Sequence, residues 1–99
     1  MALNTRHRQY LKGLAHSLSP VVRIGRSSLT PAVVTETKNA LESHELIKVR
    51  IETEDPAERK ALASQLAAES GGELVNTIGK VAILYRARDE DPEIVLPKG

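Results

Sequence analysis

Segments with helical hydrophobic periodicity alternate with short extended segments along this chain, and this alternation limits the folds that it can form. Helical patterns are expected at about 5–18, 31–44 and 56–70, and strands at 21–24, 46–52, 73–78 and 81–86. A helical crossover implies parallel neighbouring strands, whereas a tight turn joins antiparallel ones. The order α-β-α-β-α-β-β therefore predicts one compact α/β domain, with a mixed four-stranded sheet packed by helices.

The first helix is expected to begin at a Thr5 cap and to run to about Leu18, where Pro20 stops it. Its apolar positions form a helical stripe of Tyr10, Leu11, Leu14, Ala15 and Leu18.

The other two helices carry clear end signals. Thr30 is expected to cap the second helix, with Pro31 at the first position, where its missing N–H costs nothing. Asp55 is expected to cap the third helix, and Gly71-Gly72 to end it in a left-handed conformation.

Within residues 46–52, "LIKVRIE", apolar and charged side chains alternate from Ile47 to Glu52. Such alternation is typical of a strand with one buried face. Lys48 and Arg50 should therefore lie on the outer face of the sheet. The dipeptide Gly79-Lys80 should form the tight turn of a hairpin.

The chain has 99 residues, of which 40% are hydrophobic and 27% charged, and it contains no cysteine. We expect one domain over residues 1–87, followed by a polar tail over 88–99 that docks or frays. No apolar run reaches the length of a membrane span or a signal peptide. A cytoplasmic, monomeric protein that does not contact a membrane is the expectation.

The sequence offers little that points to catalysis. There is no cysteine nucleophile and no Gly-x-Ser-x-Gly elbow. His7, His16 and His44 lack metal-ligand spacing, and Gly25 stands outside any nucleotide-binding glycine motif. We therefore expect no enzyme, no metal or other cofactor and no small-molecule substrate.

The junction between the first strand and the second helix is the strongest candidate for a binding site. A helix N-terminus presents unpaired N–H groups and a partial positive charge, so an anion can dock there. The loop Gly25-Arg26-Ser27-Ser28 precedes the helix that begins at Thr30. Glycine allows close approach of a backbone, arginine is a forked donor for phosphate, and both serine hydroxyls can donate.

Basic residues are concentrated in the half of the chain that contains this junction. Residues 1–50 hold eight Lys/Arg and three Asp/Glu, whereas residues 51–99 hold six and ten. A basic surface facing a polyanion is one interpretation, and chance scatter in a short chain is the other. The further candidate residues around the junction are Arg23, Arg8, Lys12, His16, Lys48 and Arg50.

Three of these, Arg8, Lys12 and His16, are spaced to share one helix face. Lys48 and Arg50 have an equally good alternative role, which is to solvate the outer face of the sheet.

Aromatic residues are scarce, which limits how nucleic acid could be bound. The two are Tyr10 and Tyr85, and both can be placed in the core. A platform that stacks bases on aromatic rings is therefore not expected. Binding should be directed at phosphate and sugar.

Several blocks of sequence resemble the CRM domain (chloroplast RNA splicing and ribosome maturation), especially its stand-alone bacterial YhbY-type members. They are "QYLKGLAHSLSPVVRIG", "LT" at a helix start, "ALESHELIKVRI" and "NTIGKVAILYR", which run from about Thr5 to Arg86, and the terminal "LPK" is similar. The resemblance implies a KH-like fold, similar to the C-terminal domain of translation initiation factor three. It also implies RNA binding through a G-x-x-G loop beside a basic helix face.

One position departs from the family pattern. The family loop closes with a second glycine, and Ser28 takes that place here. If this position requires a positive φ, either Ser28 is strained or the loop has another shape.

The resemblance and the basic junction together predict an RNA-binding protein. Its expected partner is ribosomal RNA, in precursors of the large ribosomal subunit. The alternative is a protein–protein adaptor on such particles without RNA contact, suggested by the acidic C-terminal half. A ligand-sensing domain is a third class, but no convergent polar pocket is evident in the sequence.

Overall fold

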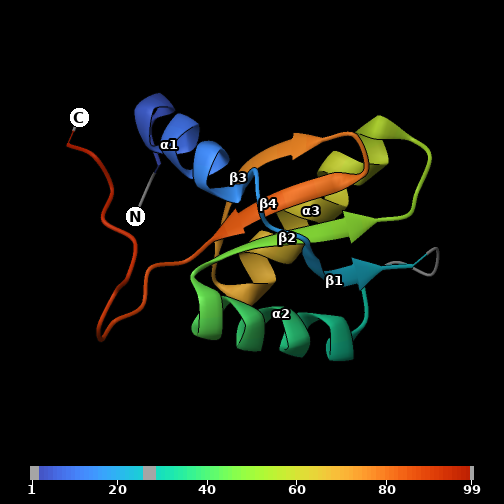
Figure 1. Ribbon diagram of the computed structural model, residues 1–99. Helices are drawn as coiled ribbons and strands as arrows, with labels where there is room; N and C mark the ends of the chain where they lie inside the picture. The colour runs from blue at the N-terminus through green and yellow to red at the C-terminus, as the bar shows by residue number, and fades with distance from the viewer. Residues whose placement is uncertain (1–2, 26–28, 99) are drawn as a thin grey trace.

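The computed structural model describes residues 3–25 and 29–98 (Figure 1). The elements are α1 (Thr5–Ala15), β1 (Pro20–Ile24), α2 (Pro31–His44), β2 (Leu46–Ile51), α3 (Pro56–Ser70), β3 (Glu73–Ile78) and β4 (Val81–Tyr85). This is the predicted order α-β-α-β-α-β-β, and the predicted mixed sheet of four strands is confirmed.

The strands lie in the order β1-β2-β4-β3. β1 is parallel to β2, whereas β4 is antiparallel to both of its neighbours. The crossover through α3 was expected to join neighbouring strands, and this expectation is wrong for β2 and β3. The hairpin returns β4 into the position between them, so that β2 and β3 run parallel but are not paired.

Helices cover both faces of the sheet (Figure 1). α2 and α3 lie against the face that carries Ile47, Val49 and Ile51, where the larger cluster of buried apolar residues forms. α1 lies over one end of the opposite face, where Leu11 and Ala15 pack in a second cluster with side chains from β2, β3 and β4. The basic outer face predicted for β2 is therefore the face that α1 covers in part.

The ends of α1 differ from those predicted. Asn4, not Thr5, is the N-cap, because its Oδ1 accepts a hydrogen bond from the His7 backbone N–H at 2.8 Å, and His7 Nδ1 accepts one from the Asn4 N–H in return. Asparagine is at least as good a cap as threonine. The helix ends at Ala15 and not near Leu18, and residues 16–17 form a turn.

The ends of the other helices agree with the sequence. The Thr30 hydroxyl accepts from the Val33 N–H at 3.2 Å, and Asp55 accepts from the Ala57 N–H at 3.0 Å. Gly71 ends α3 with φ of 77°, a left-handed conformation that glycine adopts without strain. Gly79 has φ of 55° in the hairpin between β3 and β4.

The apolar stripe of α1 is only partly buried. Leu11 and Ala15 are fully buried, but Tyr10, Leu14 and Leu18 are exposed to 42%, 40% and 38%. Tyr85, in contrast, is in the core as expected. The prediction that Tyr10 lies in the core was therefore wrong. α1 contacts only one end of the sheet, so the helix face that becomes buried is narrower than the apolar stripe in its sequence.

The C-terminal segment is anchored at both ends of its polar stretch. Residues 89–93 are exposed. However, the buried Glu45 carboxylate accepts hydrogen bonds from the backbone N–H groups of Arg88 (2.9 Å), Glu93 (2.7 Å) and Ile94 (3.0 Å). Ile94 then packs against the α1 cluster, so the tail docks.

Candidate nucleic-acid interface

The part of the sheet face that α1 leaves open carries a row of basic side chains. Arg23 on β1 and Arg50 on β2 are register partners, so they lie side by side across the two strands. Lys48 is two residues before Arg50 and projects from the same face. Arg23 is exposed, and Lys48 and Arg50 are half-buried.

Lys48 connects this row to the end of α1. Its ammonium group donates to the backbone carbonyls of Leu18 at 2.9 Å and His16 at 3.4 Å. A cation is favourable there because the last carbonyls of a helix and its following turn carry partial negative charge. Lys48 therefore has a structural role, and it brings His16 beside the sheet. Lys12 lies one turn before His16 and is exposed.

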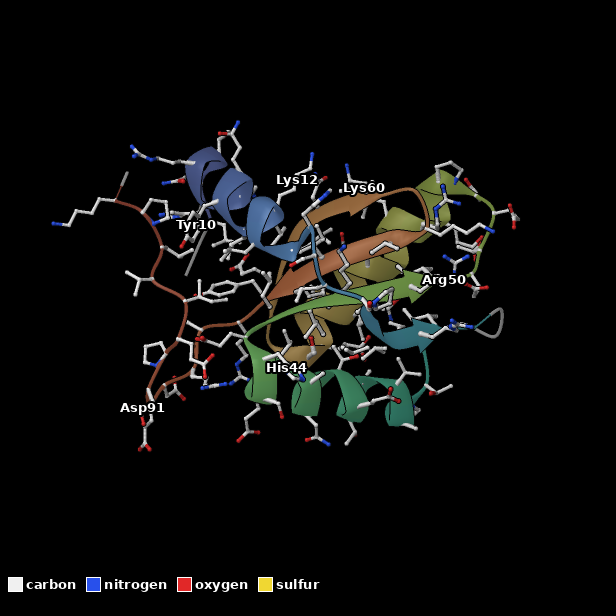
Figure 2. All side chains as sticks on the ribbon, viewed as in Figure 1. Tyr10, Lys12, His44, Arg50, Lys60 and Asp91 are labelled. Atoms are coloured by element: carbon white, nitrogen blue, oxygen red, sulfur yellow. The ribbon has the colours of Figure 1, made fainter. Side chains whose placement is uncertain are left out.

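We call the resulting surface the basic band. It consists of Lys12, His16, Lys48, Arg50 and Arg23. It runs from the last turn of α1 across the open part of the sheet to the end of β1, and Figure 2 shows Lys12 and Arg50 near its two ends.

Arg50 has a partner within the protein that a phosphate can replace. Its Nε donates to the carboxylate of Glu52, and the two side chains are 38% and 31% exposed. Ion pairs at this level of exposure contribute at most about 1 kcal/mol. The guanidinium has five N–H donors, and this contact uses the Nε edge.

Arg8 lies outside the basic band, although its spacing predicted a face shared with Lys12 and His16. The Arg8 guanidinium is turned toward β3, where it donates to the carbonyls of Leu74 and, at 3.2 Å, Val75. β3 is an edge strand, and its register with β4 shifts just after Leu74, which makes carbonyls available to a side-chain donor. In this structure Arg8 stabilises the contact between α1 and β3.

The loop at the start of α2 is described only at its two ends. Arg26, Ser27 and Ser28 lie outside the described residues. Gly25 is exposed, its φ is outside the left-handed range, and a Cβ at this position would meet no atom of the described residues within 4 Å. The φ of Gly25 therefore does not require glycine. Thr30 is exposed and caps α2.

Glu45 has an evident structural role that the sequence did not predict. Burial by itself would raise the pKa of its carboxyl, but the three amide donors and the nearby Arg88 charge outweigh burial and hold this pKa below its ordinary value. The pKa of Tyr85 is raised by burial and by the negative charge of Glu45. No signal in the sequence separates Glu45 from the other glutamates.

A metal site and a membrane span find no support in residues 3–25 and 29–98. This part of the chain holds no group of three or more His, Asp or Glu side chains placed to bind a metal ion. None of its helices combines the length and the apolar character needed to cross a bilayer.

The fold and this surface define a class of protein. Its members are α-β-α-β-α-β-β domains with a basic sheet face that is partly open. Among known protein families, the CRS1 / YhbY (CRM) domain matches residues 3–86 of this chain. The chain belongs to this family, as its sequence blocks predicted.

Relatives and one solved structure agree with this assignment. An RNA-binding protein of Haemophilus influenzae is 42% identical over 96 residues, which cover 97% of this chain and 96% of that protein. A probable RNA-binding protein of Pseudomonas aeruginosa is 40% identical over 86 residues, covering 87% and 83% of the two chains. The solution structure of a hypothetical Staphylococcus aureus protein has a TM-score of 0.87 at 33% identity, and covers 97% of this chain and 100% of that one.

Proposed function

We propose that this protein binds RNA through the basic band, and that its target is ribosomal RNA in precursors of the large ribosomal subunit. The observation that carries the proposal is the pairing of Arg23 with Arg50 on a sheet face that α1 leaves open. The names of the relatives support RNA as the ligand. The ribosomal target rests on the resemblance to the CRM domain. The proposal places a monomer in the cytoplasm.

The chemistry of the band favours contact with phosphate over contact with bases. Its donors are ammonium and guanidinium groups, which bind phosphate oxygens, and guanidinium does so with a planar fork. The band contains no aromatic side chain on which a base could stack. The N-terminus of α2, which begins just after Thr30, adds a partial positive charge beyond the end of β1. We therefore expect shape-dependent binding to a sugar–phosphate strand.

The salt dependence of binding tests this proposal. If the four Lys and Arg side chains of the band each neutralise one phosphate of single-stranded RNA, log K should fall with log[salt] with a slope of about −3. The double variant Arg23→Gln/Arg50→Gln should reduce the slope by about 1.4, because two contacts are lost. Fluorescence anisotropy with labelled fragments of large-subunit ribosomal RNA measures both quantities.

A matched control removes the same charge from the other side of the sheet. Lys38 on α2 and Lys60 on α3 are exposed, and their helices cover the opposite face. Lys38→Gln/Lys60→Gln should leave the slope nearly unchanged. If both double variants change the slope equally, only net charge matters, and the basic band is not the binding surface.

The same measurements distinguish the adaptor alternative. An adaptor that contacts proteins alone would associate with precursor particles after nuclease treatment, and its association would depend little on salt. RNA cross-linked to this protein in cells should instead be enriched in one region of the large-subunit ribosomal RNA. Enrichment of unrelated transcripts would refute the ribosomal target but not RNA binding.

A further inference from the structure

A carboxylate lies beside the basic band, at the end of β2. Glu52 directly follows this strand, and its carboxylate accepts the hydrogen bond from Arg50 Nε. Because side chains alternate along an extended chain, Glu52 projects from the same face of the sheet as Lys48 and Arg50. A phosphate strand that contacts Arg50 therefore also meets the negative charge of Glu52.

The backbone that carries Glu52 is fixed on both sides. Its N–H donates to the carbonyl of Ile24 at the end of β1, at 3.0 Å. The N–H of Ile51 donates to the carbonyl of Lys80 in the hairpin, at 2.7 Å. The Glu52 side chain is 31% exposed, whereas that of Glu54 is 85% exposed. These contacts hold the carboxylate in place before a ligand binds, so little affinity is lost in ordering it.

One oxygen of this carboxylate is available to a ligand. Arg50 Nε contacts Oε1 of Glu52, and no side chain or backbone group in residues 3–25 and 29–98 donates to Oε2. A carboxylate has about four lone-pair sites on its two oxygens and, when ionised, it only accepts hydrogen bonds. Glu52 can therefore pair with a ligand only through a donor that the ligand supplies.

The backbone of RNA carries one kind of donor, which DNA lacks. Phosphate and ring oxygens accept hydrogen bonds, whereas the ribose 2′-hydroxyl both donates and accepts. Bases carry N–H donors as well, but the basic band has no aromatic side chain on which a base could stack beside Glu52. A DNA strand on the band would therefore bring only acceptors and like charge to this carboxylate, which acts against binding.

The ion pair with Arg50 is a weak reason for a carboxylate at this place. A pair that is about one third exposed contributes little to stability, and the carboxylate reduces the attraction of Arg50 for every phosphate. This reduction becomes useful if one class of strand compensates for it and another does not. Specificity often depends on such a repulsive element in addition to the attractive ones.

We propose that Glu52 is the residue with which the basic band distinguishes RNA from DNA. Its carboxylate accepts a hydrogen bond from a 2′-hydroxyl that adjoins the phosphate bound by Arg50, and it repels a strand without this donor. The proposal rests on the proposed function, because the strand must lie on the band. It adds the ribose as a group that the protein recognises.

The experiment compares three labelled single strands of one unstructured sequence. They are RNA, DNA, and RNA in which fluorine replaces each 2′-hydroxyl. The 2′-fluoro strand keeps the sugar pucker of RNA but has no donor at this position, so it separates recognition of the hydroxyl from recognition of shape. Fluorescence anisotropy at one salt concentration gives the Kd of the full chain and of each variant for each strand.

The native protein should bind the RNA strand about tenfold more tightly than the 2′-fluoro and DNA strands, because one hydrogen bond to a charged group is lost. In Glu52→Gln this ratio should fall below about threefold, mainly because the two strands without the donor bind more tightly once the charge is removed. Glu54→Gln is the matched control. It removes the same charge two residues further on, where the carboxylate pairs with Lys80 and not with the band, and it should leave the ratio unchanged. Circular dichroism verifies that both variants are folded.

Three results would overturn the proposal. The first is equal affinity of the native protein for RNA and for the 2′-fluoro strand, and the second is an unchanged ratio in Glu52→Gln. The third is an equal fall of the ratio in Glu52→Gln and Glu54→Gln, which would show an effect of net charge alone. Failure of the basic band has a different signature, an unchanged salt slope in Arg23→Gln/Arg50→Gln, and it would overturn both proposals. A reduced slope in that variant together with any of the three results refutes only the role of Glu52.

Discussion

Replacing Glu45 by glutamine should release the C-terminal segment and destabilise the domain. Glu45 Oε2 accepts from Arg88 N–H at 2.9 Å, and Oε1 accepts the two N–H groups at the other end of the segment. Glutamine keeps one acceptor oxygen and places an NH₂ group where the other stood. At least one of the three backbone donors would then face a donor in a buried position.

The expected loss follows from the strength of these contacts and from an upper limit. A hydrogen bond to a charged group contributes about 1.5–3 kcal/mol, so three could contribute several kcal/mol. The segment can, however, detach and return its amides to water, which limits the loss to the free energy of docking the segment. We therefore expect Glu45→Gln to lower the free energy of unfolding by about 2–3 kcal/mol at pH 7.

The loss should depend on pH in a defined direction. The folded-state pKa of Glu45 lies below its ordinary value, since amide donors and Arg88 outweigh the effect of burial. The carboxylate therefore stabilises the fold above the unfolded pKa, about 4.3, and this contribution disappears as pH falls through the folded value. The difference between the native protein and Glu45→Gln should accordingly shrink between pH 5 and pH 3.

Urea unfolding at pH 7 and pH 3 measures this difference, and amide exchange at Arg88 and Ile94 localises it. Glu42→Gln is the control, because it removes an exposed carboxylate from the same end of α2. A loss below about 0.5 kcal/mol at pH 7, or a loss that is the same at both pH values, would refute the role of Glu45 as a charged anchor.

Further predictions concern the packing of α1 and of the turn after α3. Lys48→Gln should lower stability by about 1 kcal/mol, because two carbonyls after α1 lose a charged donor; an unchanged melting temperature would show that this contact is not structural. Asn4→Ala should cost about 1 kcal/mol in thermal unfolding through the lost cap, and a neutral result would mean that Thr5 can replace it. Gly72→Ala should cost about 1–3 kcal/mol, since the new Cβ would lie 3.1 Å from a Leu41 methyl carbon. Gly13→Ala, where a Cβ on α1 meets no described atom within 4 Å, should instead raise the free energy of unfolding by about 0.5–1 kcal/mol. If both glycine variants change stability in the same direction, the space around each Cβ does not explain their effects.

Local chemistry explains what the sequence could predict. The Thr30 and Asp55 caps and the left-handed Gly71 obey rules that involve neighbours within four residues. The alternation from Ile47 to Glu52 likewise indicated that Lys48 and Arg50 of β2 face outward. The order of elements followed from such signals, and so did the confirmed fold.

Contacts between distant residues explain what the sequence could not predict. Arg8 binds carbonyls 66 and 67 positions away, and Glu45 binds amides 43 to 49 positions away. No periodicity encodes such pairs. The insertion of β4 between β2 and β3 could not be predicted either, because local patterns define strands but not their order in the sheet. The apolar stripe of α1 showed which residues share a face, but it could not show that Tyr10 and Leu14 lack a cover.

The same distinction applies to the candidate site: local patterns placed some of its residues correctly, and a contact between distant residues moved another. Lys48 and Arg50 were assigned to the outer sheet face from alternation and Arg23 was a candidate because it adjoins the loop, and the structure brings the three together. The spacing of Arg8 placed it with Lys12, but the edge of β3 draws its guanidinium away. Their contact with RNA stays a prediction.

The two sides of α1 differ in their chemistry. Residues two positions apart on a helix point about 200° from each other, so the exposed Tyr10 and the Lys12 of the basic band lie on different sides of the same element (Figure 2). The basic band therefore takes up only one side of α1.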